Sequence, residues 1–431
     1  MNKKTLSKKN KIRLFTNLLC ISLSAALFLT ACTPVKKENK DNKEKNENIS
    51  ITSEAENNKG TKTSNEDTTQ ENPTPTELIV QTLDQRIQKK LSGMTLKEKV
   101  AQIFVITPEA LTGYKTVTAA GSATHSALKT YPVGGLIYFG ANIVTPNQLK
   151  TMTSNTQKYA EEIEGMGLFL AVDEEGGTVA RIGNNSKFTV KKYSNMASIG
   201  VAKDYKKAYE VGETIGSYLH KYGLNLDFAP DADVLTNPYN TAIGNRSFGT
   251  DGNLVAKMDL QVAKGLADHQ VFSCFKHFPG HGGTKGDTHE GFAYTNRTLN
   301  ELKKSELVPF QAAVNNHIPF IMISHISAPK VIGDNTPSSL SKVMITDILR
   351  KQMGYDGIII TDSMSMGAIV NTYGTKDAVI KSIQAGADLI LMPQDFKKAY
   401  QGVLDAVADG TISEQRINES LERILRVKLN M

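Results

Sequence analysis

The sequence VFSCFKHFPGHGG, residues 271–283, joins an apolar run to a loop rich in polar residues and glycine. The apolar part, residues 271–275, predicts a buried strand, and Pro279 with the glycines beyond it excludes a helix. Without a helix, His277 and His281 cannot lie on one helical face as the ligands of a zinc protease do. The polar side chains are therefore expected at the C-terminal end of a strand, where α/β barrels hold their chemistry.

Seven further apolar runs of strand length occur along the chain, and helical patterns separate them. Eight strands that alternate with helices predict an α/β fold, a single (β/α)8 TIM-type barrel without a second α/β sandwich domain. The predicted strands are residues 103–106, 135–139, 168–172, 224–228, 271–275, 320–323, 357–360 and 389–392. The predicted helices include residues 147–164, 204–222, 254–268, 342–352, 396–408 and 414–429.

Composition and charge exclude some classes of partner. The chain has 431 residues, of which 40% are hydrophobic, so it can bury a large core. The formal net charge is +6, but six lysines and arginines within the first 13 residues account for it. The rest of the chain is close to neutral, and we expect no nucleic-acid partner.

The N-terminal residues 1–31 resemble a bacterial lipoprotein signal peptide. A basic start precedes the apolar residues 14–29, and the segment ends in Leu-Thr-Ala before Cys32. We expect cleavage before Cys32 and lipidation of its thiol, which would anchor the protein to the cell membrane on the extracytoplasmic face. The alternative is an uncleaved membrane anchor, for which the apolar run is short.

Residues 32–77 contain few large apolar side chains and are expected to form a disordered tether. The catalytic domain would then comprise residues 78–431. Because Cys20 belongs to the leader and Cys32 would carry lipid, Cys274 is the one cysteine of that domain, and no intramolecular disulfide is expected.

Polar residues follow five of the predicted strands at the points where those strands end. Because the carboxyl ends of parallel strands meet at one face of a barrel, these groups converge as a site for a polyhydroxylated ligand requires. The segments are residues 173–181, 227–231, 244–249, 276–277, 324–325 and 361–363.

These motifs, together with Asp287-Thr288-His289, resemble family 3 of the glycoside hydrolases, and within it the bacterial β-N-acetylglucosaminidases, or β-hexosaminidases. The resemblance runs from Met94 to the C-terminus. It implies a retaining mechanism in which Asp362 is the nucleophile and His289, oriented by Asp287, is the acid/base. The alternatives are that Asp362 caps the next helix and that His289 is an exposed loop residue.

The resemblance also implies which residues bind the hydroxyls of the non-reducing sugar. They are Asp173, Arg181, Arg246, Lys276 and His277. Glu174 and Glu175 are expected to be scaffold, and His281 to brace its loop. His325 could either contact the sugar or support residues that do.

The implied function is exo-acting removal of terminal β-linked N-acetylglucosamine from peptidoglycan fragments, either muropeptides or N-acetylglucosaminyl-N-acetylmuramic acid disaccharides. The protein is expected to be a monomer that needs no cofactor and no metal. Two departures from the family pattern concern the flanks of the pocket. Thr178 stands where arginine is common, and residues 290–294 lack the usual leucine and proline.

Other functions remain open from the sequence. A β-glucosidase or a phosphorylase could use the same residues, because a neutral histidine would repel phosphate less than a carboxylate does. A sugar-binding lipoprotein would explain export but would not need Asp362 or the Asp287–His289 pair. A metallohydrolase would have to use the ligands His277, His281, Asp287 and His289.

Overall fold

This computed structural model describes residues 81–289 and 291–431, which belong to one compact unit. The predicted signal peptide, the lipidation site Cys32 and the tether lie outside the described residues. Over residues 81–289 and 291–431, no helix has both the length and the apolar character needed to cross a membrane.

Eight parallel strands form the barrel, in the order β10-β1-β2-β3-β6-β7-β8-β9. A parallel bridge between Ile360 and Leu389, with a 3.0 Å hydrogen bond from Thr361 N to Leu389 O, joins the two ends of this order. The strands are β1 (Phe104–Ile106), β2 (Gly135–Ile137), β3 (Phe169–Val172), β6 (Leu226–Asp227), β7 (Phe272–Phe278), β8 (Phe320–Ile323), β9 (Ile358–Thr361) and β10 (Ile390–Leu391). All eight predicted strands are therefore confirmed.

The strands read as continuous apolar runs because both of their faces are buried, one inside the barrel and one under the helices. All four residues of β8 are buried, for example. Phenylalanines from different strands pack against one another, and the rings of Phe169 in β3 and Phe320 in β8 meet edge to face at 5.2 Å.

One strand boundary differs from the prediction in a way that concerns the site. Lys276 and His277 were expected just beyond their strand, but β7 continues to Phe278, so both lie within it. The reason is tertiary: after an irregularity in register, Phe278 pairs with Ile323 of β8. The two polar side chains are thus held by strand pairing rather than by a loop.

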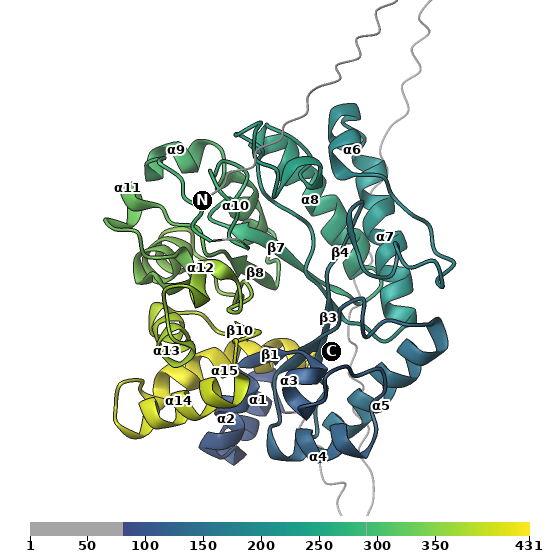
Figure 1. Ribbon diagram of the computed structural model, residues 1–431, viewed down its shortest axis with the longest axis vertical. Coiled ribbons are helices and arrows are strands. Elements are labelled where there is room, and N and C mark those ends of the chain that lie inside the picture. Colours follow the sequence, from purple (N-terminus) through teal and green to yellow (C-terminus); the bar gives the residue numbers. More distant parts are fainter. Residues whose placement is uncertain (1–80, 290) are drawn as a thin grey trace, which may run out of the picture. The chain divides into compact units, whose positions relative to one another are not determined.

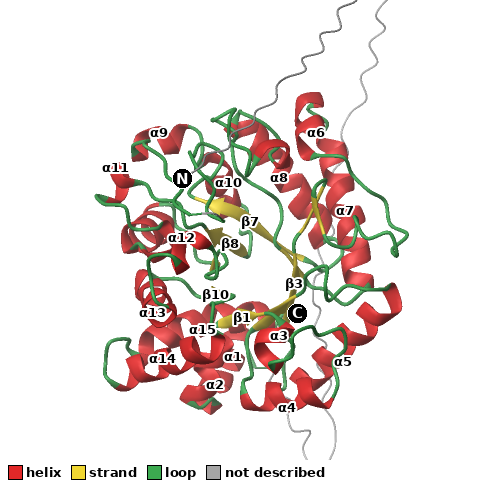
Figure 2. Ribbon diagram, viewed as in Figure 1, coloured by secondary structure: helices red, strands yellow, loops and turns green. Residues whose placement is uncertain are grey.

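Helices surround the strands, as Figures 1 and 2 show. The α-helices are α1 (Leu83–Gly93), α2 (Leu96–Gln102), α3 (Pro108–Thr112), α4 (Ser122–Thr130), α5 (Pro146–Glu164), α6 (Met196–Ala202), α7 (Tyr205–Lys221), α8 (Gly252–Ala267), α9 (Leu299–Lys304), α10 (Val308–Asn315), α11 (Pro329–Ile332), α12 (Gly367–Val370), α13 (Thr375–Ala385), α14 (Phe396–Ala408) and α15 (Glu414–Lys428). Two 3₁₀ helices, η1 (Gly244–Arg246) and η2 (Ser338–Leu340), and a π-helix, η3 (Val343–Gln352), complete the set.

Local sequence sets the ends of these helices. At α5, the Thr145 side chain accepts a hydrogen bond from Gln148 N in a capping box, and Pro146 occupies the first turn. Gly165 ends the helix in the left-handed conformation, with φ of 63°. The six predicted helices are all confirmed, although residues 343–352 form a π-helix.

A two-stranded hairpin, β4 (Glu174–Gly176) and β5 (Val179–Ala180), follows β3. Its turn contains Gly176 and Gly177, whose φ angles of 85° and 61° favour glycine. A Cβ on Gly177 would also lie 2.9 Å from the backbone oxygen of Ser194. The hairpin reverses the chain so that Arg181 faces the same cavity as Asp173.

Candidate active site

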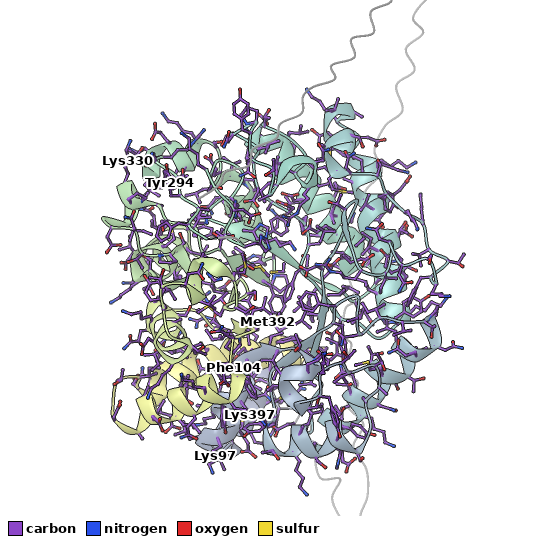
Figure 3. The ribbon with its side chains drawn as sticks, in the orientation of Figure 1. Lys97, Phe104, Tyr294, Lys330, Met392 and Lys397 are labelled. Carbon is purple, nitrogen blue, oxygen red and sulfur yellow. The ribbon has the colours of Figure 1, made fainter. Side chains whose placement is uncertain are left out.

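A cavity of about 460 Å³ opens at the C-terminal ends of the barrel strands. Seven of the eight predicted catalytic and binding residues line it, namely Asp173, Arg181, Arg246, Lys276, His277, His289 and Asp362. Apolar side chains form the rest of the wall, among them Phe139, Phe228 and Met392. In Figure 3, Met392 lies near the centre of the barrel, whereas Tyr294 and Lys330 lie at its periphery. The cavity therefore combines several charged groups with apolar surface, as a sugar site requires.

Asp362 is the first residue after β9 and is partly buried. Its Oδ1 atom accepts a 2.7 Å hydrogen bond from Ser363 N. Burial alone would raise the pKa of Asp362, but His277, His325 and the Ser363 amide together lower it below its usual value. The side chain is thus held as a carboxylate. The helix-cap alternative is wrong, because α12 begins at Gly367 with Met366 as its N-cap.

His289 and Asp287 form a pair at the rim of the cavity. Asp287 Oδ1 accepts hydrogen bonds from His289 Nδ1 at 2.7 Å and from His289 N at 2.9 Å. Although partial burial would raise the pKa of Asp287, these two bonds and the charge of His289 lower it. Asp287 does not line the cavity, whereas His289 does. The bond occupies Nδ1, so Nε2 is the ring atom that can exchange protons with a ligand.

Lys276 connects two of the acids at the cavity wall. Its Nζ atom lies 2.9 Å from Asp173 Oδ1 and 2.6 Å from Glu175 Oε1. Burial would lower the pKa of the ammonium, but Asp173 and Glu175 raise it above its usual value. Arg181 lies 3.5 Å from Asp173 Oδ2 and over the ring of Phe139, at 5.6 Å from its centroid.

Glu175 was expected to be scaffold, and the structure places it in the cavity wall as well. Its carboxylate lines the cavity and accepts two hydrogen bonds from Arg246, at 2.8 Å and 2.7 Å. Burial would raise the pKa of Glu175, but Arg246 and Lys276 hold it well below its usual range. The alternation of side chains could have indicated that Glu175 faces the cavity, since residues 173 and 175 lie on the same side of an extended segment.

Glu174 points the other way and is scaffold, as predicted. Its carboxylate accepts hydrogen bonds from Ile182 N, Gly183 N and the hydroxyl of Tyr218. These bonds fix the chain beyond the β4–β5 hairpin, and so they fix the position from which Arg181 extends.

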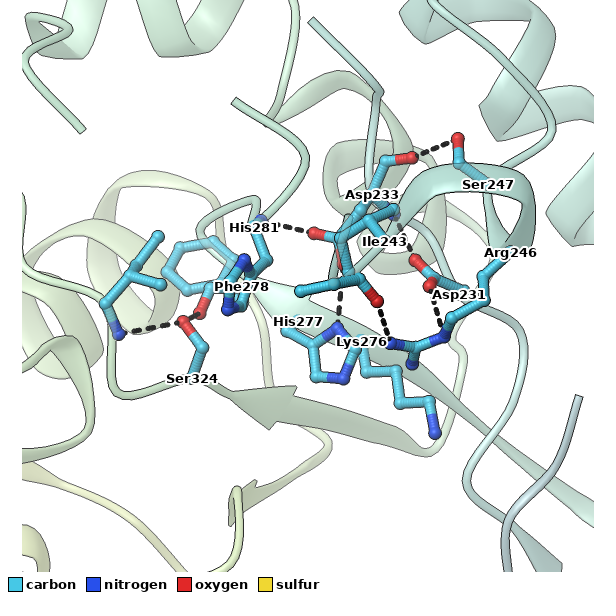
Figure 4. A network of polar contacts seen from close by, with 12 residues as sticks. Asp231, Asp233, Ile243, Arg246, Ser247, Lys276, His277, Phe278, His281 and Ser324 are labelled. Carbon is cyan, nitrogen blue, oxygen red and sulfur yellow. Dashed lines mark hydrogen bonds and ion pairs between the residues drawn. The ribbon is translucent and has the colours of Figure 1, made fainter. Parts of the chain in front are cut away.

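Two aspartates after β6 complete the polar network, which Figure 4 shows. Asp233 Oδ2 lies 2.7 Å from His277 Nδ1, and Asp231 Oδ2 lies 3.1 Å from Arg246 Nε. Burial, followed by the charge of Arg246, lowers the pKa of His277 to about 4. His277 is therefore neutral near pH 7. Its Nδ1–H donates to Asp233, and its Nε2 can accept a hydrogen bond from a hydroxyl. Neither aspartate was assigned a role from the sequence.

Two further histidines of the predicted motifs, His281 and His325, do not line the cavity. His325 is buried, with Nδ1 2.7 Å from Ser339 Oγ and Nε2 2.9 Å from the backbone oxygen of Ser363. It therefore supports the segment that carries Asp362, which decides between its two predicted roles. His281 contacts Thr284 and Thr288 and braces the loop, as predicted.

The four ligands of the metallohydrolase alternative do not come together. Within the described part of the chain, the group that brings three possible ligand atoms within 4.8 Å of one another is Asp231, Asp233 and His277. In that group, Asp233 is already hydrogen-bonded to His277, and Asp231 is paired with Arg246. The geometry of the described residues therefore does not support one metal ion bound by His277, His281, Asp287 and His289.

Comparisons with known proteins agree with this geometry. The family described as "Glycosyl hydrolase family 3 N terminal domain" matches residues 95–427. Beta-hexosaminidase LpqI of Mycobacterium tuberculosis is 31% identical over 345 residues, which cover 77% of this chain and 82% of that protein. Beta-hexosaminidase A of Pseudoalteromonas piscicida is 31% identical over 330 residues, and the match covers 70% of this chain but only 54% of that relative.

A solved structure is similar as well. The glycoside hydrolase family 3 beta-N-acetylglucosaminidase from Paenibacillus sp. superposes with a TM-score of 0.72 at 35% sequence identity. The superposition covers 78% of this chain and 62% of that one.

Proposed function

The chain belongs to glycosyl hydrolase family 3, and we propose that this glycoside hydrolase of the β-N-acetylhexosaminidase type removes terminal β-linked N-acetylglucosamine from peptidoglycan fragments by double displacement. One observation carries the proposal. A carboxylate with a lowered pKa, Asp362, and a histidine paired with an aspartate, His289 with Asp287, line or flank one cavity of sugar size.

In the first step, the Asp362 carboxylate attacks the anomeric carbon and forms a glycosyl ester. The bond to the leaving oxygen breaks as His289 Nε2–H transfers its proton to that oxygen. Asp287 accepts the Nδ1–H bond and so stabilises the imidazolium that donates the proton.

In the second step, the now neutral His289 removes a proton from water, and the resulting hydroxide attacks the anomeric carbon. The ester bond to Asp362 breaks, and the sugar leaves with its original configuration. His289 is protonated again, so that all groups return to their starting state.

The charged wall of the cavity would hold the sugar. The carboxylate of Asp173 can accept hydrogen bonds from hydroxyls, and Lys276 and Arg246 can donate to hydroxyl oxygens. Neutral His277 would accept a hydrogen bond from a hydroxyl through Nε2. Lys276 contacts Asp173 and Glu175, Arg246 contacts Glu175, and His277 contacts Asp233. These contacts hold the side chains in place before substrate arrives.

The natural substrate and the location are inferred from the leader. A lipoprotein anchored through Cys32 on the extracytoplasmic face would meet cell-wall fragments, and N-acetylglucosamine is a terminal sugar of such fragments. We propose a monomer whose lipid holds it at the membrane.

The test is turnover of p-nitrophenyl β-N-acetylglucosaminide and of the matching β-glucoside by the purified protein, with and without inorganic phosphate. The proposal predicts hydrolysis of the N-acetylglucosaminide at a rate independent of phosphate. Release of a sugar 1-phosphate would instead identify a phosphorylase, and preference for the glucoside would identify a β-glucosidase. Sugar binding without turnover would identify a sugar-binding lipoprotein.

A further inference from the structure

Thr288 lies between the catalytic candidates Asp287 and His289 and is buried, although both of these neighbours are more exposed. Its exposed fraction is 1%, whereas the side chain of His289 is 69% exposed. A polar side chain that is buried at this point needs hydrogen-bond partners. The hydroxyl of Thr288 has such a partner within the same loop, and its backbone oxygen has a partner on the segment after β9.

The first partner is His281, whose Nε2 atom lies 3.2 Å from Thr288 Oγ1. The proton positions follow from the neighbours. The hydroxyl of Thr284 donates to the backbone oxygen of His281, so it can only accept from His281 Nδ1–H, at 2.9 Å. In the neutral ring Nε2 is then an acceptor, and the hydroxyl of Thr288 donates to it.

His281 is itself held firmly. Its backbone amide donates to Asp233 Oδ1, and its backbone oxygen accepts a 2.7 Å bond from Asn240 Nδ2. Because Asp233 also binds His277, it links His281, the acceptor of the Thr288 hydroxyl, to the wall of the sugar site.

The second partner is on the segment that carries the nucleophile candidate. The backbone oxygen of Thr288 accepts a 3.2 Å hydrogen bond from Ala368 N in α12. The residues that lead from Asp362 to α12, including Ser365 and Gly367, line the cavity. Thr288 thus joins the loop after β7 to the loop after β9.

The base of the loop is closed separately. Lys285 and Tyr294 exchange two backbone hydrogen bonds, at 3.1 Å and 3.2 Å. This pairing fixes where the loop leaves the barrel, and Thr288, next to His289, links the middle of the loop to His281 and to α12. Loss of that contact would let the exposed imidazole move without unfolding the base.

We propose that Thr288 is a positioning residue that holds His289 where its Nε2 atom can reach the leaving oxygen of a sugar that Asp362 attacks. The inference rests on the proposed function, because it assumes that His289 is the acid/base. Proton transfer needs His289 Nε2 and the leaving oxygen within about 2.6–3.2 Å of each other. A misplacement of about 1 Å can reduce the rate by about 10²-fold.

The test compares Thr288→Val, which keeps the shape but removes the hydroxyl, with Thr288→Ser, which keeps the hydroxyl. Substrates are the phenyl and the 2,4-dinitrophenyl β-N-acetylglucosaminides, of which only the first needs protonation of its leaving oxygen. We expect Thr288→Val to lower kcat/KM for the phenyl substrate by about 10- to 100-fold. The dinitrophenyl substrate should change little, and Thr288→Ser should restore most of the loss.

An equal loss of kcat/KM on both substrates, or no loss on either, would overturn the inference. Thr288→Ala removes the same hydroxyl and provides the same comparison if the valine variant does not fold. His289→Ala, measured in parallel, separates the two claims. If His289→Ala loses more kcat/KM on the phenyl than on the dinitrophenyl substrate and the Thr288 variants do not, the inference alone fails. If His289→Ala loses the same on both substrates, the acid/base role of His289 fails as well.

Discussion

Nδ1 of His289 lies 2.7 Å from Oδ1 of Asp287, and the same oxygen accepts the backbone amide of His289 at 2.9 Å. Two residues of one loop thereby form the pair that we propose as the acid/base unit. The backbone bond fixes the carboxylate, and the carboxylate fixes the ring. The pair differs from the two carboxylic acids that most glycosidases use.

Replacement of Asp287 tests this unit. Asp287→Asn keeps an oxygen that can accept from Nδ1–H but removes the charge that stabilises the imidazolium. We expect kcat/KM for the phenyl β-N-acetylglucosaminide to fall by about 10²-fold, with little change for the dinitrophenyl substrate. Steady-state kinetics on both substrates measure the effect, and exposed Asp356→Asn serves as the control. Equal sensitivity of both substrates would show that Asp287 does not act through the proton.

Glu175→Gln should destabilise the protein. The carboxylate is buried between Lys276 and Arg246, and its loss leaves two cations in the barrel with less opposite charge. Loss of one partner of a buried ion pair reduces the free energy of unfolding by roughly 3–5 kcal/mol. Denaturant unfolding measures this, with Glu419→Gln, a largely exposed glutamate, as the control. A change below about 1 kcal/mol would mean that Asp173 and Asp231 suffice to neutralise the cations.

Lys428 makes the stability depend on pH. Its ammonium is buried, donates to Gln102 Oε1 at 2.9 Å and lies over the ring of Phe169. Burial lowers the pKa of Lys428 to about 7, below its unfolded value of about 10.4. Between these values the unfolded chain binds a proton that the folded chain lacks, so this lysine's contribution to the free energy of unfolding rises with pH.

The comparison of wild type with Lys428→Met isolates that contribution. The unfolding free energy of the wild type minus that of Lys428→Met should rise by up to about 1.4 kcal/mol per pH unit between about pH 7 and 10. Denaturant unfolding at several pH values measures it, and the exposed Lys397→Met should show no such slope. A flat difference across this range would contradict the assignment.

The barrel could be predicted from the sequence because each strand is a short run that is apolar on both faces. It was not sufficient for the end of β7, where the pairing of Phe278 with Ile323 depends on a register irregularity between strands. Asp362, His289 and the sugar-binding candidates could be predicted because they belong to motifs with characteristic residues.

The residues that were missed act through partners that are distant in the chain. Asp233 is 44 residues from His277, and nothing in its local sequence indicates that contact. Thr288 was quoted in a motif without a role, since its burial arises only when the loop packs against His281 and α12. Glu175 could have been separated from Glu174 by the alternation of side chains in an extended segment.

The most direct measurement of the central claim is the mass of the protein during turnover. His289→Ala should react normally with the 2,4-dinitrophenyl β-N-acetylglucosaminide in the first step but lack the base for the second, so the glycosyl ester should accumulate. The account predicts a mass increase of one N-acetylglucosaminyl residue, mapped by peptide sequencing to Asp362. Turnover without an adduct, or an adduct on another residue, would contradict it.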